Sequence, residues 1–326
     1  MIRREFIALL GGTAASWPLV AWAQQKERVW RIAHVIPSGR SIISQQFAKE
    51  FEQRLLELGY VIGRDIVLTT RVTEPKEAEQ VIAELLAETD LLVIWTTHGA
   101  SIAKKLAPTI PVVFLAVAAP VEIGLITNLA HPDGNITGVT AEATSETYAK
   151  RLQILAEIVP NLNRVAVLRT VGDAHVAIAM ASLTQAAPDL SVKLLTFEIR
   201  SADDLEQAFA AMMNISTQAL IVIGTAVTYA AGARIAELAL AHHLPACYPF
   251  RDTVAAGGLV SLSPDFDVIA RRGADYVSKI VKGAKAGELP VEQPTGYALH
   301  INLKTAKALA LEVPPTVLAR ADEIIE

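Results

Sequence analysis

Short, almost entirely apolar runs alternate along this chain with longer segments in which apolar residues recur every three or four positions. Residues 92–95 and 220–223 are two such runs, and neither contains a polar side chain. Runs without alternating polarity are typical of strands buried on both faces, whereas residues 44–58 have the spacing of an amphipathic helix. Strands that alternate with helices of this length predict an α/β protein with parallel, doubly wound sheets.

The same order of elements occurs twice. Residues 31–114 and residues 164–250 each read as strand, helix, strand, helix, strand, helix and strand. A repeat of this extent predicts two lobes of similar architecture, and a ligand would lie in the cleft between them. The matched strands are 31–35 with 164–168, 66–68 with 192–195, 92–97 with 220–225, and 110–114 with 244–248.

The chain is expected to cross between the lobes more than once. Turn residues at 131–135 lead into an apolar run at 136–140, and paired glycines precede a second run at 259–262. Several crossings form a hinge about which two lobes can close on a ligand. The predicted parts are a signal peptide at 1–23, lobe 1 at 29–139 plus 263–296, and lobe 2 at 143–258 plus 297–326.

Composition and charge narrow the range of partners. The 326 residues are 52% hydrophobic and 19% charged, which indicates a globular chain long enough for two domains. The net charge is −5 and the basic residues are scattered, so nucleic acid is not an expected partner. Cys247 is the sole cysteine, which excludes an intrachain disulfide, and its place after Pro245 in a strand predicts inert core.

The N-terminus has the three parts of an export signal. Arg3 and Arg4 form a charged start similar to the twin-arginine motif, an apolar run follows at 6–20, and small residues precede Gln24. The run is shorter than the roughly 20 residues that span a bilayer. We therefore predict cleavage after Ala23 and a periplasmic product without stable membrane insertion; an uncleaved membrane anchor is the alternative.

Motifs for catalysis, cofactors and metals are missing from the sequence. Residues 37–41 after the first strand match neither the dinucleotide-binding glycine pattern nor a P-loop, and there is no G-x-S-x-G nucleophile motif. The histidines do not pair at metal-binding spacing. We therefore predict neither a catalytic residue, nor a cofactor, nor a metal.

Small polar residues at the carboxyl ends of the predicted strands are the candidate ligand-binding set, because ligands of open parallel sheets bind outside those ends. Each could instead be a turn residue or a helix cap. Arg169 could clamp a carboxylate or remain a solvated rim charge, and Trp95 could stack on a ligand or pack in the core. The candidates are Ser38, Gly39, Trp95, Thr96, Thr97, His98, Ala118, Ala119, Arg169, Thr170, Gly224, Thr225, Tyr248, Arg251 and Ser261.

Two stretches resemble a known family. Residues 111–138 and the C-terminal motifs from 257 to 323 are similar to bacterial ABC-transporter substrate-binding proteins, in the type I periplasmic group with tryptophan- and aromatic-amino-acid-binding members. The resemblance implies two doubly wound parallel-sheet lobes joined by a multi-crossing hinge. It also implies a protein that closes over a small solute and delivers it to an inner-membrane permease with its ATPase.

The chain departs from this family at three positions near the expected cleft. Ala119 replaces a frequent Asp, residues 169–171 replace an aromatic-Asn-Pro motif, and Ser261 begins a segment that replaces Ser-Tyr-Gly. The missing Asp weakens the case for an α-ammonium group, so a carboxylate-bearing solute is favoured over an amino acid. An exported α/β enzyme or a sensory ligand-binding module remains the alternative, and neighbouring genes for a permease or a kinase would discriminate.

Overall fold

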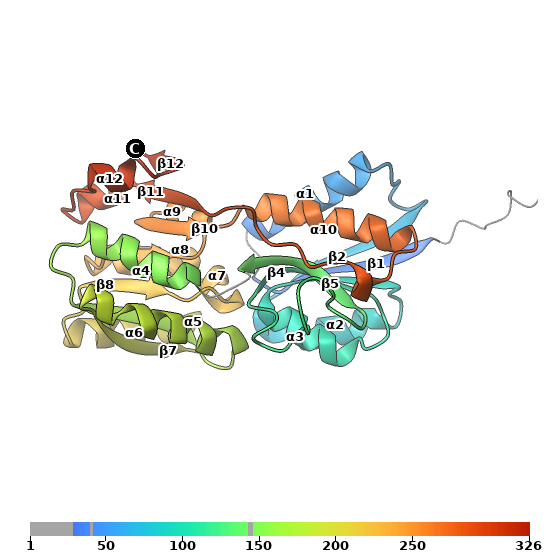
Figure 1. Cartoon of the computed structure of the whole chain (residues 1–326), viewed down its shortest axis with the longest axis horizontal. Coiled ribbons are helices and arrows are strands. Elements are labelled where there is room, and N and C mark those ends of the chain that lie inside the picture. Colours follow the sequence, from blue (N-terminus) through green and yellow to red (C-terminus); the bar gives the residue numbers. More distant parts are fainter. Residues whose placement is uncertain (1–28, 40–41, 143–145) are drawn as a thin grey trace, which may run out of the picture.

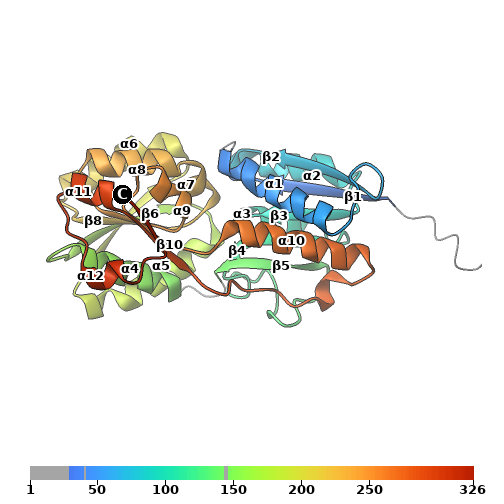
Figure 2. The same ribbon diagram turned by 90° about the horizontal axis from the view of Figure 1, so that it is seen from above.

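A computed structural model describes residues 29–39, 42–142 and 146–326. The predicted signal peptide lies outside the described residues. Two α/β lobes lie end to end along the long axis, each with a central sheet between layers of helices (Figures 1 and 2). The predicted α/β, two-lobed fold is therefore confirmed.

Lobe 1 contains a five-stranded sheet in the order β2-β1-β3-β4-β5, and all its strands are parallel. Its helices are α1 (Ile42–Glu57), α2 (Ala78–Leu86), α3 (Thr97–Leu106) and α10 (Phe266–Val281), with a short 3-10 turn η1 (Pro75–Glu77) before α2. Its strands are β1 (Trp30–Ile36), β2 (Ile66–Val72), β3 (Leu91–Trp95), β4 (Val112–Ala118) and β5 (Ile136–Glu142).

Lobe 2 contains a seven-stranded sheet in the order β12-β11-β10-β9-β8-β6-β7. Its helices are α4 (Glu146–Ile158), α5 (Ala174–Ala186), α6 (Leu205–Asn214), α7 (Ala226–Ala230), α8 (Gly232–Ala241), α9 (Arg251–Ala255), α11 (Leu303–Ala308) and α12 (Pro315–Leu318). Whereas the 3-10 turn η4 (Ala286–Glu288) follows α10 and packs against β5 of lobe 1, lobe 2 has the 3-10 turns η2 (Pro188–Leu190) and η3 (Ala202–Asp204). Its strands are β6 (Arg164–Thr170), β7 (Lys193–Ile199), β8 (Ala219–Val222), β9 (Ala246–Tyr248), β10 (Val260–Ser263), β11 (Ala298–Asn302) and β12 (Glu323–Ile325).

The pairing of β10 with β11 is the antiparallel pairing of this sheet. Its direction follows from the path of the chain, because β10 leads out of lobe 2 and β11 leads back into it after α10 has packed on lobe 1 (Figure 1). A strand that returns from the other lobe enters from the cleft side, so it runs against its neighbour.

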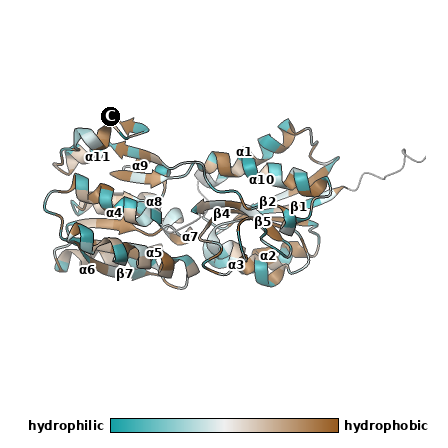
Figure 3. Ribbon diagram, viewed as in Figure 1, coloured by the Kyte–Doolittle hydropathy of each residue, from teal (hydrophilic) through white to brown (hydrophobic). Residues whose placement is uncertain are grey.

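The positions that the hydrophobic spacing predicted as core are buried. Phe47, Phe51 and Leu55 form one face of α1 and pack on the lobe 1 sheet, and all residues of β3 are buried. Figure 3 shows the same pattern, with strands mostly hydrophobic and helices that change character between faces. Gly59 follows α1 with φ +92, the left-handed conformation expected of a residue that ends a helix.

Three crossings join the lobes: β5 to α4, β10 to α10, and the segment that leads from α10 back to β11. Side-chain hydrogen bonds connect the crossing segments to one another. Arg151 on α4 donates to the Leu262 carbonyl at the end of β10, over 3.0 Å from Nε and 2.8 Å from Nη2. The Tyr297 hydroxyl on the third crossing donates to the Ala141 carbonyl of β5 over 3.1 Å.

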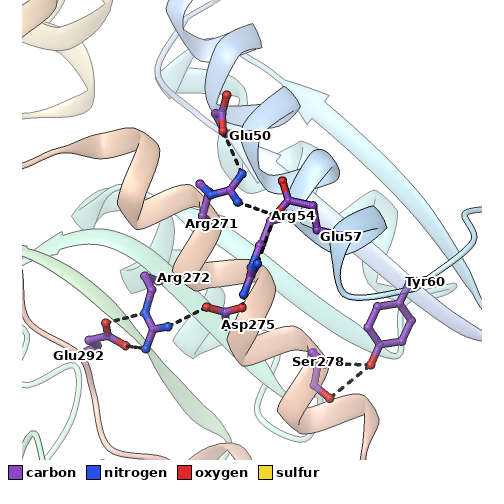
Figure 4. A network of polar contacts seen from close by, with 9 residues as sticks. All are labelled: Glu50, Arg54, Glu57, Tyr60, Arg271, Arg272, Asp275, Ser278 and Glu292. Carbon is purple, nitrogen blue, oxygen red and sulfur yellow. Dashed lines mark hydrogen bonds and ion pairs between the residues drawn. The ribbon is translucent and has the colours of Figure 1, made fainter.

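Helix α10 belongs to lobe 1 although it follows β10 in the chain. It packs beside α1 through Ile269, Ala274 and Val277, and a polar network runs along the same contact (Figure 4). Arg54 Nε lies 2.9 Å from Asp275 Oδ1. The third crossing is attached to the same helix by Arg272, whose Nε lies 2.6 Å from Glu292 Oε1.

Candidate ligand cleft between the lobes

A cleft lies between the lobes at the carboxyl ends of β1 and β3 in lobe 1 and of β6 and β8 in lobe 2. Its empty space is about 620 Å³, part of which is open solvent. Ligands of open parallel sheets bind outside such strand ends. The cleft is therefore the place in this fold where a solute would be held.

The Trp95 side chain at the end of β3 is fixed by a buried histidine. Its indole Nε1 donates to His34 Nε2 over 2.8 Å, and both side chains are buried. Burial lowers the pKa of His34 to about 3, so the imidazole is neutral and can accept this bond. Trp95 thus satisfies its polar atom inside the protein and contributes an apolar surface to the cleft.

Aromatic rings from both lobes form one wall of the cleft. Phe47 stacks on Trp95 with centroids 4.9 Å apart and planes 6° apart, and Phe47 also lies 5.7 Å from Phe266. From lobe 2, Tyr229 packs edge-on against Phe250 at 4.8 Å. Phe250 lies 5.8 Å from Phe266, so the wall continues from one lobe to the other. Such a wall suits a flat apolar group.

Hydrogen-bond donors lie on the lobe 1 side of this wall. Thr96 has φ +72 and caps α3, because its Oγ1 accepts from Gly99 N over 3.1 Å. Thr97 Oγ1 accepts from Ala118 N over 3.0 Å, and Ser38 Oγ lies 3.2 Å from Ser44 Oγ. The first turn of α3 leaves backbone N–H groups without helical partners, and the helix dipole there favours a negative group.

A buried charged group closes the hinge side of the cleft. Glu142 ends β5, and its Oε1 lies 2.5 Å from Arg151 Nη2. His175 Nε2 lies 3.7 Å from Glu142 Oε2. Burial alone raises the pKa of the Glu142 carboxyl, but Arg151 and His175 more than offset it, so the pKa lies below its ordinary value. Glu142 is therefore an ionised carboxylate inside the protein.

Lobe 2 holds the neighbouring polar groups in place. The Tyr148 hydroxyl accepts from Gly224 N over 3.0 Å, and burial raises the pKa of Tyr148. Asp173 caps α5, because its Oδ1 accepts from His175 N over 3.1 Å. Thr225 caps α7 in the same way through Thr228 N. These contacts set the positions of the side chains that face the cleft.

The structure brings part of the sequence-predicted set to the cleft. Trp95 is both packed and part of the cleft wall, and Thr96, Thr97 and Thr225 combine a place in the wall with a structural contact of their own. Ala118 lines the same space. The candidate residues from the sequence that line the cleft are Ser38, Trp95, Thr96, Thr97, Ala118, Gly224 and Thr225. Their role in binding stays a prediction.

Three other predicted residues make contacts within lobe 2. Arg169 lies opposite Glu198 on the neighbouring strand β7 and forms an ion pair with it. Thr170 Oγ1 lies 2.8 Å from Thr225 Oγ1 and is buried behind it. Arg251 pairs with Glu323, with Nε 2.7 Å from Oε2. Arg169 thus has a partner in its own sheet and does not line the cleft.

The remaining predicted residues also have places outside the cleft surface. Gly39 lies against lobe 2, where a Cβ added to it would be 2.9 Å from Ala230 Cβ. Ala119 is buried and donates its N–H to the Glu142 carbonyl over 2.8 Å. Tyr248 is a core residue of lobe 2, and Ser261 Oγ lies 3.3 Å from His300 Nδ1. His98 is exposed on α3.

Sequence reasoning missed most of the charged and aromatic lining. One signal was present: Glu142 is a charge at the end of an otherwise uncharged run, and Arg151 interrupts the apolar stripe of Tyr148, Leu152 and Leu155 on α4. A charge on the buried face of a strand or a helix calls for an opposite charge nearby. The aromatic wall gave no such signal, because its rings come from five separate segments.

Three further features of the described part of the chain concern metal binding, the single thiol and membrane-spanning helices. Residues 29–39, 42–142 and 146–326 hold no cluster of three or more His, Cys, Asp or Glu side chains that could bind a metal. Cys247 is fully buried, and burial raises its pKa to about 12, so the thiol is unreactive core as its sequence position predicted. In the same residues, no helix has the length and apolar character needed to cross a membrane.

Residues 44–325 match the family of ABC transporter substrate binding proteins. The chain belongs to this family. It is therefore the substrate-binding component of an ABC transporter, and its family is one of binding proteins rather than enzymes. The predicted recognition and function are confirmed at this level.

Similar proteins agree with this assignment. A tyrosine-binding protein of Clostridioides difficile strain R20291 is 21% identical over 273 residues, which are 81% of this chain and 76% of the relative. A conserved domain protein from Vibrio cholerae has a similar solved structure, with a TM-score of 0.84 and 24% identity over 91% of this chain and all of that one. An ABC domain from Streptococcus pneumonia in complex with L-Trp gives a TM-score of 0.83 and 20% identity, with the same coverage.

Proposed function

We propose that this substrate-binding protein takes up a small aromatic acid: a solute with a flat apolar ring and a carboxylate, held between the two lobes. The lobes close over the solute, and the closed protein delivers it to an inner-membrane permease with its ATPase. The protein works in the periplasm after removal of the signal at residues 1–23, which lie outside the described part of the chain.

The observation that carries the proposal is the aromatic wall shared between the lobes. Phe47, Trp95 and Phe266 reach it from lobe 1, and Tyr229 and Phe250 reach it from lobe 2. A ring placed against this wall would contact both lobes at once. The energy of stacking and burial would then favour closure, because the contacts with the second lobe exist only in the closed form.

The carboxylate is assigned to the lobe 1 side of the cleft. There the N-terminus of α3 and the hydroxyls of Ser38 and Thr97 supply hydrogen-bond donors. Among the described residues that line the cleft, none is Lys or Arg. The acid would therefore be held by neutral donors rather than by a salt bridge, which replaces the role that the sequence suggested for Arg169.

The relatives support an aromatic solute. One is named for tyrosine and another was solved with L-Trp, and both ligands carry a ring and a carboxylate. At 20–21% identity these names set the class of ligand to test first and leave its identity open to experiment.

The test is a ligand screen read by tryptophan fluorescence and confirmed by calorimetry. Removal of residues 1–23 leaves Trp30 and Trp95, of which Trp95 lies in the cleft. Aromatic acids should change the emission of the native protein and of Trp30→Phe, and the response should vanish in Trp95→Phe. Solution scattering should show a smaller radius of gyration with a saturating ligand.

Absence of saturable binding by any aromatic acid in calorimetry would overturn the proposed solute class. The location is tested separately: mass spectrometry of periplasmic protein should find Gln24 at the N-terminus. An intact N-terminus in the membrane fraction would contradict export with cleavage.

A further inference from the structure

Buried polar atoms without a hydrogen-bond partner gather at the hinge side of the cleft. Glu142 Oε2, Arg151 Nη1 and both ring nitrogens of His175 are buried atoms of this kind. Glu142 is 5% exposed and His175 is 2% exposed, and both line the cleft. Buried polar atoms in folded proteins usually have a partner, so the atoms of the two cleft-lining residues are candidates to bind a polar group of a ligand.

Each carboxylate at this place already has a favourable partner within the protein. The Glu142 carboxylate pairs with Arg151, and the Asp173 carboxylate caps the first turn of α5, where the helix dipole is positive. A cationic ligand group would lose its hydration here and would gain no unpaired negative charge as a partner. An anionic group would be repelled by Glu142. The balance favours a neutral polar group.

The geometry suits one oxygen atom that both donates and accepts. Glu142 Oε2 and His175 Nε2 are 3.7 Å apart, too far for a direct hydrogen bond. At this separation, one oxygen atom could lie at ordinary hydrogen-bond distance from both atoms and bridge them. A hydroxyl can donate its proton to the carboxylate and accept the ring N–H of His175, whereas an ammonium has no lone pair with which to accept.

We propose that Glu142 and His175 form a subsite for a hydroxyl group of the solute. The inference rests on the proposed function and adds to it the substrate class, a hydroxylated aromatic acid. Arg151 is a positioning residue, which holds Glu142 ionised and oriented through Oε1 while Oε2 remains for the ligand.

Matched ligands test the subsite. Calorimetry on the mature protein would compare 4-hydroxyphenylacetate with phenylacetate, and 3-(4-hydroxyphenyl)propionate with 3-phenylpropionate. 4-(Aminomethyl)phenylacetate provides the cationic counterpart. We expect each hydroxylated acid to bind at least about tenfold more tightly than its partner without the hydroxyl, the effect of one hydrogen bond to a charged group. We expect the amine to bind more weakly than the hydroxylated acids.

Variants then test whether Glu142 and His175 cause the preference for the hydroxyl. His175→Gln and Glu142→Gln should remove most of the preference for the hydroxyl, measured in each variant as the ratio of the affinities for 4-hydroxyphenylacetate and phenylacetate. His242→Gln, at the end of α8 outside the cleft, is the matched control and should keep the full preference. If a variant fails to fold, a crystal structure of the native complex decides, because the hydroxyl should lie within hydrogen-bond distance of Glu142 Oε2.

The outcomes separate this inference from the proposed function. No binding by any of these acids would overturn the proposed function. Equal binding of hydroxylated and unhydroxylated acids would overturn the subsite alone, as would a hydroxyl preference that survives both variants. Tighter binding of the amine would assign the subsite to a cation and overturn the proposed hydroxyl subsite. A crystal structure of the complex with only water between Glu142 and His175 would also overturn the hydroxyl subsite.

Discussion

The two lobes share one strand and helix unit but present different surfaces to the cleft. In each lobe a threonine at the end of the third strand of the repeat caps the next helix, Thr96 through Gly99 N and Thr225 through Thr228 N. Beside these matched caps the side chains diverge. Lobe 1 contributes Trp95 and Phe47, whereas lobe 2 contributes Tyr148 and His175 beside the carboxylate at the end of β5.

The lobes also bury their histidines differently. His34 in lobe 1 is neutral and serves only the Trp95 indole, within an apolar core. His175 in lobe 2 lies beside a buried ion pair and faces the cleft. The comparison teaches that the fold fixes where ligand-facing positions lie, while the residues at those positions decide which chemical groups each lobe presents to the cleft. The following predictions test this contrast, from the largest expected effect to the smallest.

Arg151→Met should be the most destabilising change, because it leaves the buried Glu142 carboxylate without a counter-charge. We expect a loss of about 3–5 kcal/mol in the free energy of unfolding, measured by urea denaturation. Adding Glu142→Gln should recover much of that loss. Arg169→Met is the matched control in the same lobe. A loss below about 1 kcal/mol for Arg151→Met would mean that the Arg151–Glu142 pair contributes little to the stability of the fold.

Lowering the pH should destabilise the protein because of the buried histidine of lobe 1. The folded pKa of His34 is lowered to about 3, so below pH 6.5 the unfolded state binds a proton that the folded state does not. Stability should therefore fall by roughly 1.4 kcal/mol per pH unit from pH 6.5 downward. Glu142, whose folded pKa lies below 4.5, adds its loss only at lower pH.

Urea denaturation between pH 7 and pH 4.5 measures this slope, with His34→Gln as the comparison. The amide oxygen of Gln can accept the Trp95 indole N–H but does not titrate. The variant should lose stability less steeply than the native protein over this range. Equal slopes would show that His34 does not stay neutral in the folded state.

Contact between the lobes should be sensitive to Gly39. Gly39→Ala places a Cβ against Ala230 of lobe 2 and also requires φ +82. Gly63→Ala shares the strained torsion, with φ +90, but meets nothing within 4 Å. Both should lose about 1 kcal/mol of stability. Gly39→Ala alone should weaken ligand binding and closure, measured by calorimetry and scattering; equal affinities would indicate that this contact does not form on closure.

Arg169→Ala should have the smallest effect. The Arg169 and Glu198 side chains are partly exposed, so the pair contributes at most about 1 kcal/mol of stability. Arg169 does not line the cleft, and we expect unchanged affinity for any aromatic acid. An affinity loss of 1.5–3 kcal/mol, the size of a charged hydrogen bond to a ligand, would return Arg169 to the site.

Much of the fold follows from local sequence. The apolar spacing of residues 44–58 predicted α1 to within two residues at each end, and Ser201 with Asp204 forms a capping box, which is a local sequence motif. Pro75 lies in a first turn, and Cys247 is buried. Each of these depends on neighbours along the chain or on a single residue's preference, which is why the sequence alone determined it.

The cleft depended on tertiary structure. Glu142, Arg151 and His175 come from a strand of one lobe and two helices of the other, and they meet only because three crossings bring those elements to one place. Arg169 could be placed only once the register of β6 with β7 put Glu198 opposite it. Sequence spacing fixes which residues are buried and which elements they form. Which buried charge meets which partner, and which ring faces another across the cleft, is decided by the packing of segments distant in the chain.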